Sequence, residues 1–289
     1  MIRIQHTRKA GLWALVLLAS AGSASLAAET VTFTEKKLQP GAVRTESSRM
    51  KMNLNLAVSV GGVQLGTFKQ TEAEVTRKLE KVLAVKGGVP NEISVTYKKA
   101  IKVKTARGQT RTKAKEIQGK SYKVKGGPAG STVVYLDGKA PGGKEVGLVR
   151  KDYKSLGKPD RMEQNLVGRQ LTKGQRAPFL ESTLREFVAG GKADEVRDLK
   201  IIFKGTRSCA GFQCGVFDIS LTMGAKIDAN AEMSMTLNGE IMVRVEGAWP
   251  VSINLKGPVS MQGSNVSDGR KMEMKGGGEM ELNIEYVYK

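Results

Sequence analysis

The sequence predicts a mainly β protein of the α+β class, with antiparallel, curved sheets or a partly open barrel in two β regions that a central helical segment joins. Three observations support this fold: long runs of alternating apolar and polar residues, glycine-rich breaks between these runs, and one stretch with helical spacing. Such alternation is typical of antiparallel strands that cover a core with one face only.

The N-terminal β region is expected over residues 28–142. Its longest alternating run places apolar side chains at every second position, at Met50, Met52, Leu54, Leu56, Val58 and Val60. Gly61-Gly62 and Gly87-Gly88 are predicted turns. Residues 71–83 are ambiguous, because their apolar spacing is helical while their flanks suit long strands equally well.

The C-terminal β region, residues 192–289, repeats the alternation and is expected to be a β-meander. Its apolar positions include Phe217, Ile219, Leu221, Met223, Met233, Met235, Leu237, Ile241, Val243, Ile253, Leu255, Met280, Leu282, Ile284 and Tyr286. Four breaks with turn residues are predicted turns, namely Asn238-Gly239, Lys256-Gly257-Pro258, Ser267-Asp268-Gly269 and Gly276-Gly277-Gly278. The length permits both one continuous domain and two lobes.

The connector between the two β regions, residues 143–191, has helical spacing. Apolar residues recur there at Val146, Val149, Tyr153 and Leu156 before Gly157 and Pro159. A second helix is expected to begin at Pro178 and to end at Gly190-Gly191. We expect the apolar sides of these helices to pack on a sheet or to close the mouth of a curved one.

Residues 1–27 are predicted to be a cleaved signal peptide, because a basic start and a short apolar stretch precede the small-residue site Ser25-Leu26-Ala27. The stretch is shorter than the ~20 residues that span a bilayer. We therefore expect an exported protein of the periplasm or the extracellular space, soluble or peripherally attached to the cell envelope. Cleavage leaves 44 basic against 28 acidic residues, a formal charge of +16 that favours anionic partners.

The only histidine, His6, lies in the predicted signal peptide. A chain without histidine cannot build a Ser-His-Asp or Cys-His nucleophile or an imidazole zinc site. No carboxylate pair stands out for acid–base chemistry. We therefore expect a protein that is not an enzyme and that has neither cofactor nor metal.

A glycine-rich loop invites comparison with a phosphate-binding loop, because Gly138, Gly143 and Lys144 match the first part of that motif. The next position requires a Ser or Thr hydroxyl for Mg²⁺, and here it is Glu145. We expect no nucleotide site.

The two cysteines, Cys209 and Cys214, flank a short loop between two predicted strands. In an oxidising compartment they are expected to form a structural disulfide bond, since their spacing is not that of redox enzymes.

The densest run of positive charge is the candidate binding site for an anionic partner. It contains Lys98, Lys99, Lys102, Lys104, Arg107, Arg111, Lys113, Lys115, Lys120, Lys123 and Lys125, against the single acid Glu116. Because lysines alternate with apolar residues at 101–104 and 122–125, we expect two strands to present them on a shared outward face. The alternative is that the lysines only protect an exposed strand edge from pairing with other chains.

Two functions of different classes follow from these features. The first is an exported, non-catalytic binding or structural protein of the cell envelope whose basic sheet face contacts polysaccharide, lipopolysaccharide or lipid headgroups. The second is a periplasmic carrier of acyl chains in a cavity lined by Met and Leu, because methionine is soft and repacks easily. A small outer-membrane β-barrel or an envelope enzyme ranks lower, and the oligomeric state stays open.

Overall fold

The structure is a computed structural model, and it describes residues 29–128, 130–188, 196–228, 230–267 and 270–289. The predicted signal peptide, His6 and the predicted helix end at Gly190-Gly191 lie outside these residues, so those expectations stay predictions.

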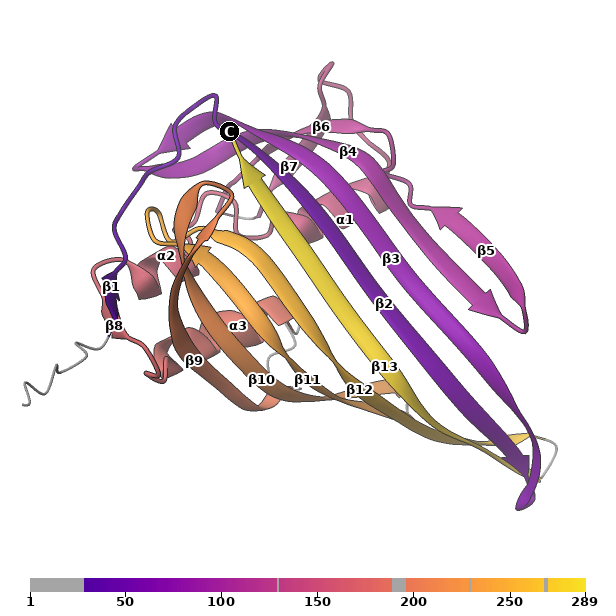
Figure 1. The fold of residues 1–289 in the computed structure, drawn as a ribbon. Helices are drawn as coiled ribbons and strands as arrows, with labels where there is room; N and C mark the ends of the chain where they lie inside the picture. Colours follow the sequence, from indigo (N-terminus) through magenta and orange to yellow (C-terminus); the bar gives the residue numbers. More distant parts are fainter. Residues whose placement is uncertain (1–28, 129, 189–195, 229, 268–269) are drawn as a thin grey trace, which may run out of the picture.

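One large antiparallel sheet of eleven strands forms the body, in the order β7-β6-β4-β3-β2-β13-β12-β11-β10-β9, with β5 beside β4. The strands are β2 (Val43–Val60), β3 (Val63–Lys86), β4 (Val89–Ala106), β5 (Gln109–Ala114), β6 (Ser121–Lys125), β7 (Thr132–Tyr135), β9 (Val196–Cys209), β10 (Phe212–Asp228), β11 (Ala231–Arg244), β12 (Pro250–Ser267) and β13 (Arg270–Tyr288). The prediction of a mainly β, antiparallel fold is confirmed. The sheet is curved and not closed (Figure 1).

The pairing of β2 with β13 joins the two β regions into this single sheet. It extends from Arg44 opposite Tyr288 to Val60 opposite Met272 without a register shift. The ambiguous residues 71–83 belong to the long strand β3. A small second sheet pairs β1 (Thr30–Thr32) with β8 (Gln170–Thr172).

Two-residue turns connect several neighbouring strands. Both residues have positive φ in Gly61-Gly62, Gly87-Gly88, Arg107-Gly108 and Ala210-Gly211. This conformation is that of a type I′ hairpin turn, whose twist matches that of the flanking strands. The predicted turns at Gly61-Gly62 and Gly87-Gly88 are therefore confirmed.

Three of the predicted C-terminal turns are wrong, because their glycines lie inside strands. Gly239, Gly257, Gly276 and Gly278 belong to β11, β12 and β13 and point to the concave face of the sheet. A Cβ at any of them would come well within 3.0 Å of a backbone carbonyl oxygen of the neighbouring strand. Glycine permits this close approach, and the sheet bends there instead of ending. The fourth predicted turn includes residues 268–269, which are outside the described part.

The helices cover the concave face at one end of the sheet (Figure 1). α2 (Arg161–Leu166), the 3₁₀ turn η1 (Pro178–Leu180) and α3 (Glu181–Val188) join the main core with β9–β13 and β2. α1 (Gly143–Asp152) packs on β4, β6 and β7 in a second core around Tyr97 and Tyr122. The two predicted helices are present, although α1 ends at Asp152, before the predicted end at Gly157 and Pro159, and Pro178 begins the 3₁₀ turn that precedes α3. α2 was not predicted.

Gly239, Gly257, Gly276 and Gly278 are named here the bend glycines, and replacing one of them should destabilise the protein. We expect Gly257→Ala to lower the free energy of unfolding by about 1–3 kcal/mol, as overpacking usually does, because its Cβ would meet the Thr236 carbonyl oxygen. The matched control is Gly66→Ala in β3, where a Cβ meets nothing within 4 Å. Urea unfolding of both variants tests this, and equal stabilities would contradict the bend assignment.

Candidate functional site

The concave face changes from apolar to cationic across five neighbouring strands. Residues directly opposite one another in antiparallel strands put their side chains on the same side. One cross-strand row contains Met280, Met52, Glu72, Lys104 and Arg111, and the next contains Leu282, Met50, Glu74, Lys102 and Lys113. Each row therefore begins with apolar side chains on β13 and β2 and ends with basic side chains on β4 and β5.

The apolar part of this surface is named here the methionine face. It comprises nine methionines of the described strands, namely Met50, Met52, Met223, Met233, Met235, Met261, Met272, Met274 and Met280. Met50 and Met272 are exposed, while several others are only partly buried against the main core. Leu54 and Leu56 are buried between them. Unbranched thioether side chains thus fill the interior of the curve, and such side chains repack at little cost.

The cationic part is named here the basic strip, and it comprises Lys102, Lys104, Arg111 and Lys113. Lys102 and Lys104 are half exposed, and their ammonium groups lie 3.1 and 3.3 Å from the Glu72 carboxylate. Partial burial of Glu72 opposes ionisation, but hydrogen bonds and charge from these lysines outweigh it and lower the pKa of Glu72. Glu74 on the same face pairs with Lys115. Two carboxylates therefore leave an excess of positive charge on the strip.

The structure does not bring all the predicted basic residues onto one face. β4 contains one extra residue, Lys98, between Tyr97 opposite Lys78 and Lys99 opposite Arg77. Such a β-bulge reverses which residues of a strand point to each side. Lys102 and Lys104 consequently lie on the concave side, whereas Lys123 and Lys125, opposite Ser94 and Glu92, lie on the convex side. The expectation that these four lysines share a face is wrong.

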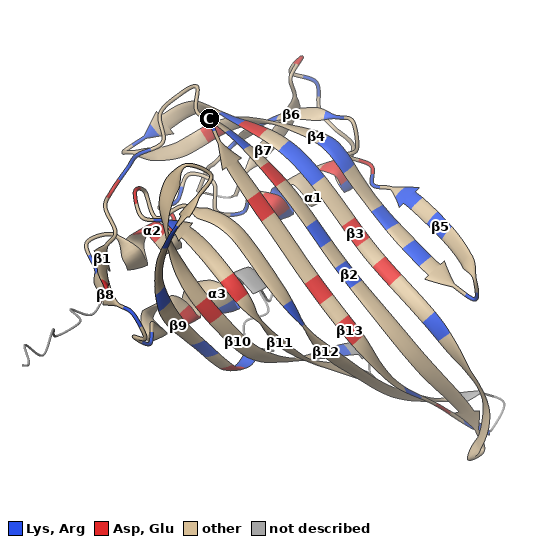
Figure 2. Cartoon of the chain, viewed as in Figure 1, with Lys and Arg blue, Asp and Glu red and all other residues tan. Residues whose placement is uncertain are grey.

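The remaining basic residues of the run are dispersed. Lys99 faces the convex side, Arg107 occupies the β4–β5 turn, and basic residues recur along β3, β4 and β5 in Figure 2. Lys120 pairs with Glu145 and Lys123 with Glu92. Counting charge along the sequence missed these carboxylates, because they come from other elements. The surface around these residues therefore has a smaller excess of positive charge than the sequence of the run suggests.

Glu145 in the first turn of α1 connects this helix to the sheet through hydrogen bonds. Its carboxylate accepts hydrogen bonds from Lys120 Nζ at 2.7 Å, Tyr122 Oη at 2.6 Å and Tyr135 Oη at 2.7 Å. These donors lower the pKa of Glu145 to about 2. The residue that departs from the phosphate-loop motif thus has a structural role.

A buried ionic cluster closes one end of the concave face, and sequence reasoning missed it. Glu80 accepts from Arg44 at 2.7 Å and from Tyr153 Oη at 2.5 Å, while Lys78 lies 3.1 Å from Glu46. Burial alone would raise the pKa of Glu80, but the charges of Arg44 and Lys78 lower it. The only sequence signal was charged residues at the inward positions of β2 and β3.

Other features of the described residues are structural. Cys209 and Cys214 form the predicted disulfide bond across the β9–β10 turn. Within the described ranges, no group of His, Cys, Asp or Glu side chains could hold a metal ion. None of the helices that the structure describes is long and apolar enough to cross a membrane.

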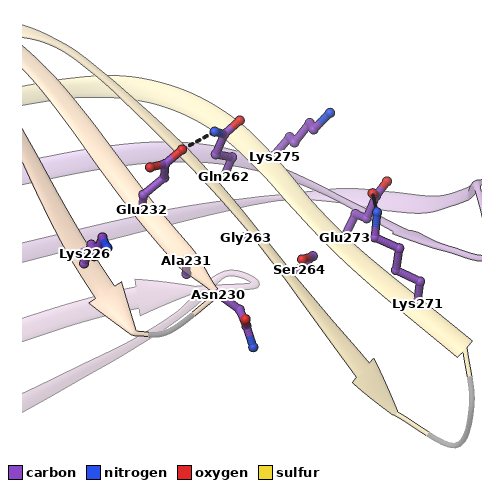
Figure 3. A pocket seen from close by; sticks show the side chains of 10 residues that line it. All are labelled: Lys226, Asn230, Ala231, Glu232, Gln262, Gly263, Ser264, Lys271, Glu273 and Lys275. Carbon is purple, nitrogen blue, oxygen red and sulfur yellow. Dashed lines mark hydrogen bonds and ion pairs between the residues drawn. The ribbon is translucent and has the colours of Figure 1, made fainter.

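A shallow hollow on the convex face of β10–β13 is polar and nearly balanced in charge. Figure 3 shows Lys226, Lys271 and Lys275 beside Glu232 and Glu273. Gln262 donates to Glu232, and Lys271 pairs with Glu273 at 2.6 Å. This hollow has neither the apolar surface nor the charge excess of the concave face, so the concave face is the candidate site.

Comparisons with known proteins give only distant structural similarity. No family model matches the sequence, and no curated protein matches it. A structure of lipovitellin with its lipid–protein interactions is 10% identical, with a TM-score of 0.34, and covers 87% of this chain and 26% of that chain. This chain thus spans about a quarter of the lipovitellin chain.

Two bacterial structures are also similar. An outer membrane channel from Pseudomonas putida F1 is 6% identical, with a TM-score of 0.20 over 87% of this chain and 97% of that one. A LolA superfamily protein from Nitrosomonas europaea is 10% identical, with a TM-score of 0.14 over 81% and 85%. All three TM-scores are below 0.5, so the function proposed below depends on the geometry alone.

Glu145 should stabilise the fold in a way that depends on pH. Its pKa is lowered on folding, so its contribution is present above the ordinary glutamate value of ~4.3 and is lost as the pH falls toward 2. We expect Glu145→Gln to be destabilised at pH 6 and the difference from the unmodified protein to shrink as the pH approaches 2. Urea unfolding from pH 6 to 2.5 measures this.

Glu285→Gln, on the exposed face of β13, is the control, and it should behave like the unmodified protein at each pH. A difference for Glu145→Gln that stays constant with pH would contradict the role of its ionised carboxylate.

Proposed function

We propose that the protein binds anionic amphiphiles, with the acyl chain on the methionine face and the charged headgroup at the basic strip. The observation that supports this most directly is the pair of cross-strand rows in which methionine leads to lysine and arginine on one face. The function is non-catalytic binding or carriage of lipid.

The distances suit such a ligand. Met52 and Lys104 lie on the same row with β3 between them, so their backbones are separated by two strand spacings, about 10 Å at ~4.8 Å each. Along β2, the ten residue-to-residue steps from Met50 to Val60 extend about 33 Å at ~3.3 Å per residue. This exceeds the length of chains in one leaflet, which is about half of the ~30 Å hydrocarbon core.

The methionine face supplies the adaptability that acyl chains require. Several of its methionines pack against the main core, so a chain would bind by displacing them. Because Met52, Met233, Met261, Met274 and Met280 are only partly buried, their displacement costs less than that of fully packed side chains.

Among possible anionic partners, an amphiphile with one charged headgroup fits the concave face better than a polysaccharide or lipopolysaccharide. A polyanion would favour a broad cationic surface, whereas the bulge at Lys98 divides the lysines between the two faces. The basic strip also directly borders apolar side chains, as an amphiphile requires.

Because two lysines of the run lie on the concave side and two on the convex side, the position of the headgroup can be tested with matched variants. We expect Lys102→Ser with Lys104→Ser to weaken oleate binding about fivefold, since each partly exposed charge contributes on the order of 0.5 kcal/mol. Binding of oleyl alcohol, which lacks the charge, should not change. Calorimetric titration measures both.

The control is Lys123→Ser with Lys125→Ser on the convex face, which should leave oleate binding unchanged. Equal losses for the two pairs would show that only net charge matters and would contradict the assigned headgroup position.

A second substitution tests the acyl-chain surface. Met52→Gln keeps the length of the side chain but adds a polar amide, so both oleate and oleyl alcohol should bind several-fold more weakly. Met242→Gln is the control, because Met242 lies on the convex side beside Arg207. If Met52→Gln binds both ligands as the unmodified protein does, the methionine face is not the chain site.

A further inference from the structure

The hairpin between β2 and β3 projects beyond β4 at the end of the sheet opposite the helices, while β13 extends beside it (Figure 1). The last pair between β3 and β4 is Gln70 opposite Ala106. Residues 63–69 of β3 therefore extend about 23 Å, at ~3.3 Å per residue, with no described strand on that side. The other side is held by β13, where Gly61 N donates to Lys271 O at 2.9 Å.

This projecting end exposes large apolar side chains to solvent. Val63 is 66% exposed and Leu65 is 68% exposed, and Met272 of β13 is also exposed beside Val60. These residues and the Gly61-Gly62 turn are named here the hairpin tip. Large apolar side chains that remain exposed together mark a contact with another molecule or a membrane.

Basic residues lie on the strands next to the hairpin tip. Among the described residues, Lys69, Arg270, Lys271 and Lys275 are exposed on β3 and β13, and Lys271 pairs with Glu273. Basic residues beside a small apolar wedge complement the anionic headgroups and the hydrocarbon of a bilayer.

We propose that the hairpin tip inserts into the surface of an anionic lipid bilayer. The methionine face continues to this tip, because Val58, Val60 and Val63 occupy the concave side of the hairpin with Met272 and Met274. A lipid could therefore pass between bilayer and methionine face along one apolar surface. Bilayer contact by the tip does not require that the proposed amphiphile binding is correct.

Co-sedimentation with vesicles tests this contact. The full chain should bind vesicles of equal phosphatidylglycerol and phosphatidylcholine, and weakly bind phosphatidylcholine alone. Val63→Ser with Leu65→Ser should reduce binding to the anionic vesicles about tenfold, because the apolar insertion is lost. Leu136→Ser is the matched control and should bind normally, because Leu136 is 59% exposed on the loop after β7, away from the tip.

Two further measurements separate the outcomes. Leu65→Trp should show a blue-shifted emission and quenching by brominated lipid on adding anionic vesicles. Oleate binding in solution should be unchanged in Leu65→Ser alone, because Leu65 lies at a register shift and has no cross-strand partner on the rows of the methionine face. Failure of tip docking is therefore distinguishable from failure of the proposed amphiphile site. Normal vesicle binding by the Val63→Ser, Leu65→Ser variant, or dimerisation through the tip in ultracentrifugation without vesicle binding, would overturn the proposal.

Discussion

The close approach of backbones at the bend glycines is the constraint on which the rest of the structure depends. Strands of 14 to 19 residues at β11, β12 and β13 would form a flatter sheet if every inward position carried a side chain. At Gly239, Gly257, Gly276 and Gly278 the neighbouring carbonyl oxygen occupies the place of a Cβ. The sheet therefore curves, and the apolar side chains on its concave side pack against one another and against the helices.

The second constraint is the single extra residue at Lys98 in β4. Before it, Tyr97 points into the core under α1, and after it Lys102 and Lys104 point to the same concave side. Without the bulge, Ile101 and Val103 would face that side and extend the apolar surface to β5. One inserted residue therefore makes the concave face amphipathic, which the proposed ligand requires.

Local patterns predicted much of the fold but little of the site. Alternation at 50–60 correctly assigned Met50 and Met52 to one face, and the spacing at 143–156 and the proline at 178 located two helices. Glycines in β11–β13 were mistaken for turns, because a glycine at a bend and a glycine in a turn look alike without the neighbouring strand. The pairing of β2 with β13, the bulge at Lys98 and the ion pairs of Glu72 and Glu145 depend on residues far apart in sequence, so no local pattern encodes them.

The position of a bound acyl chain tests the account most directly. A fatty acid with a photoreactive diazirine in its chain can be cross-linked to the full protein and mapped by peptide mass spectrometry. The account predicts cross-links to concave-side residues of β2 and β13, such as Met50, Met52 and Met280. Cross-links confined to convex-side residues such as Lys51, Asn53 or Glu281 would contradict it.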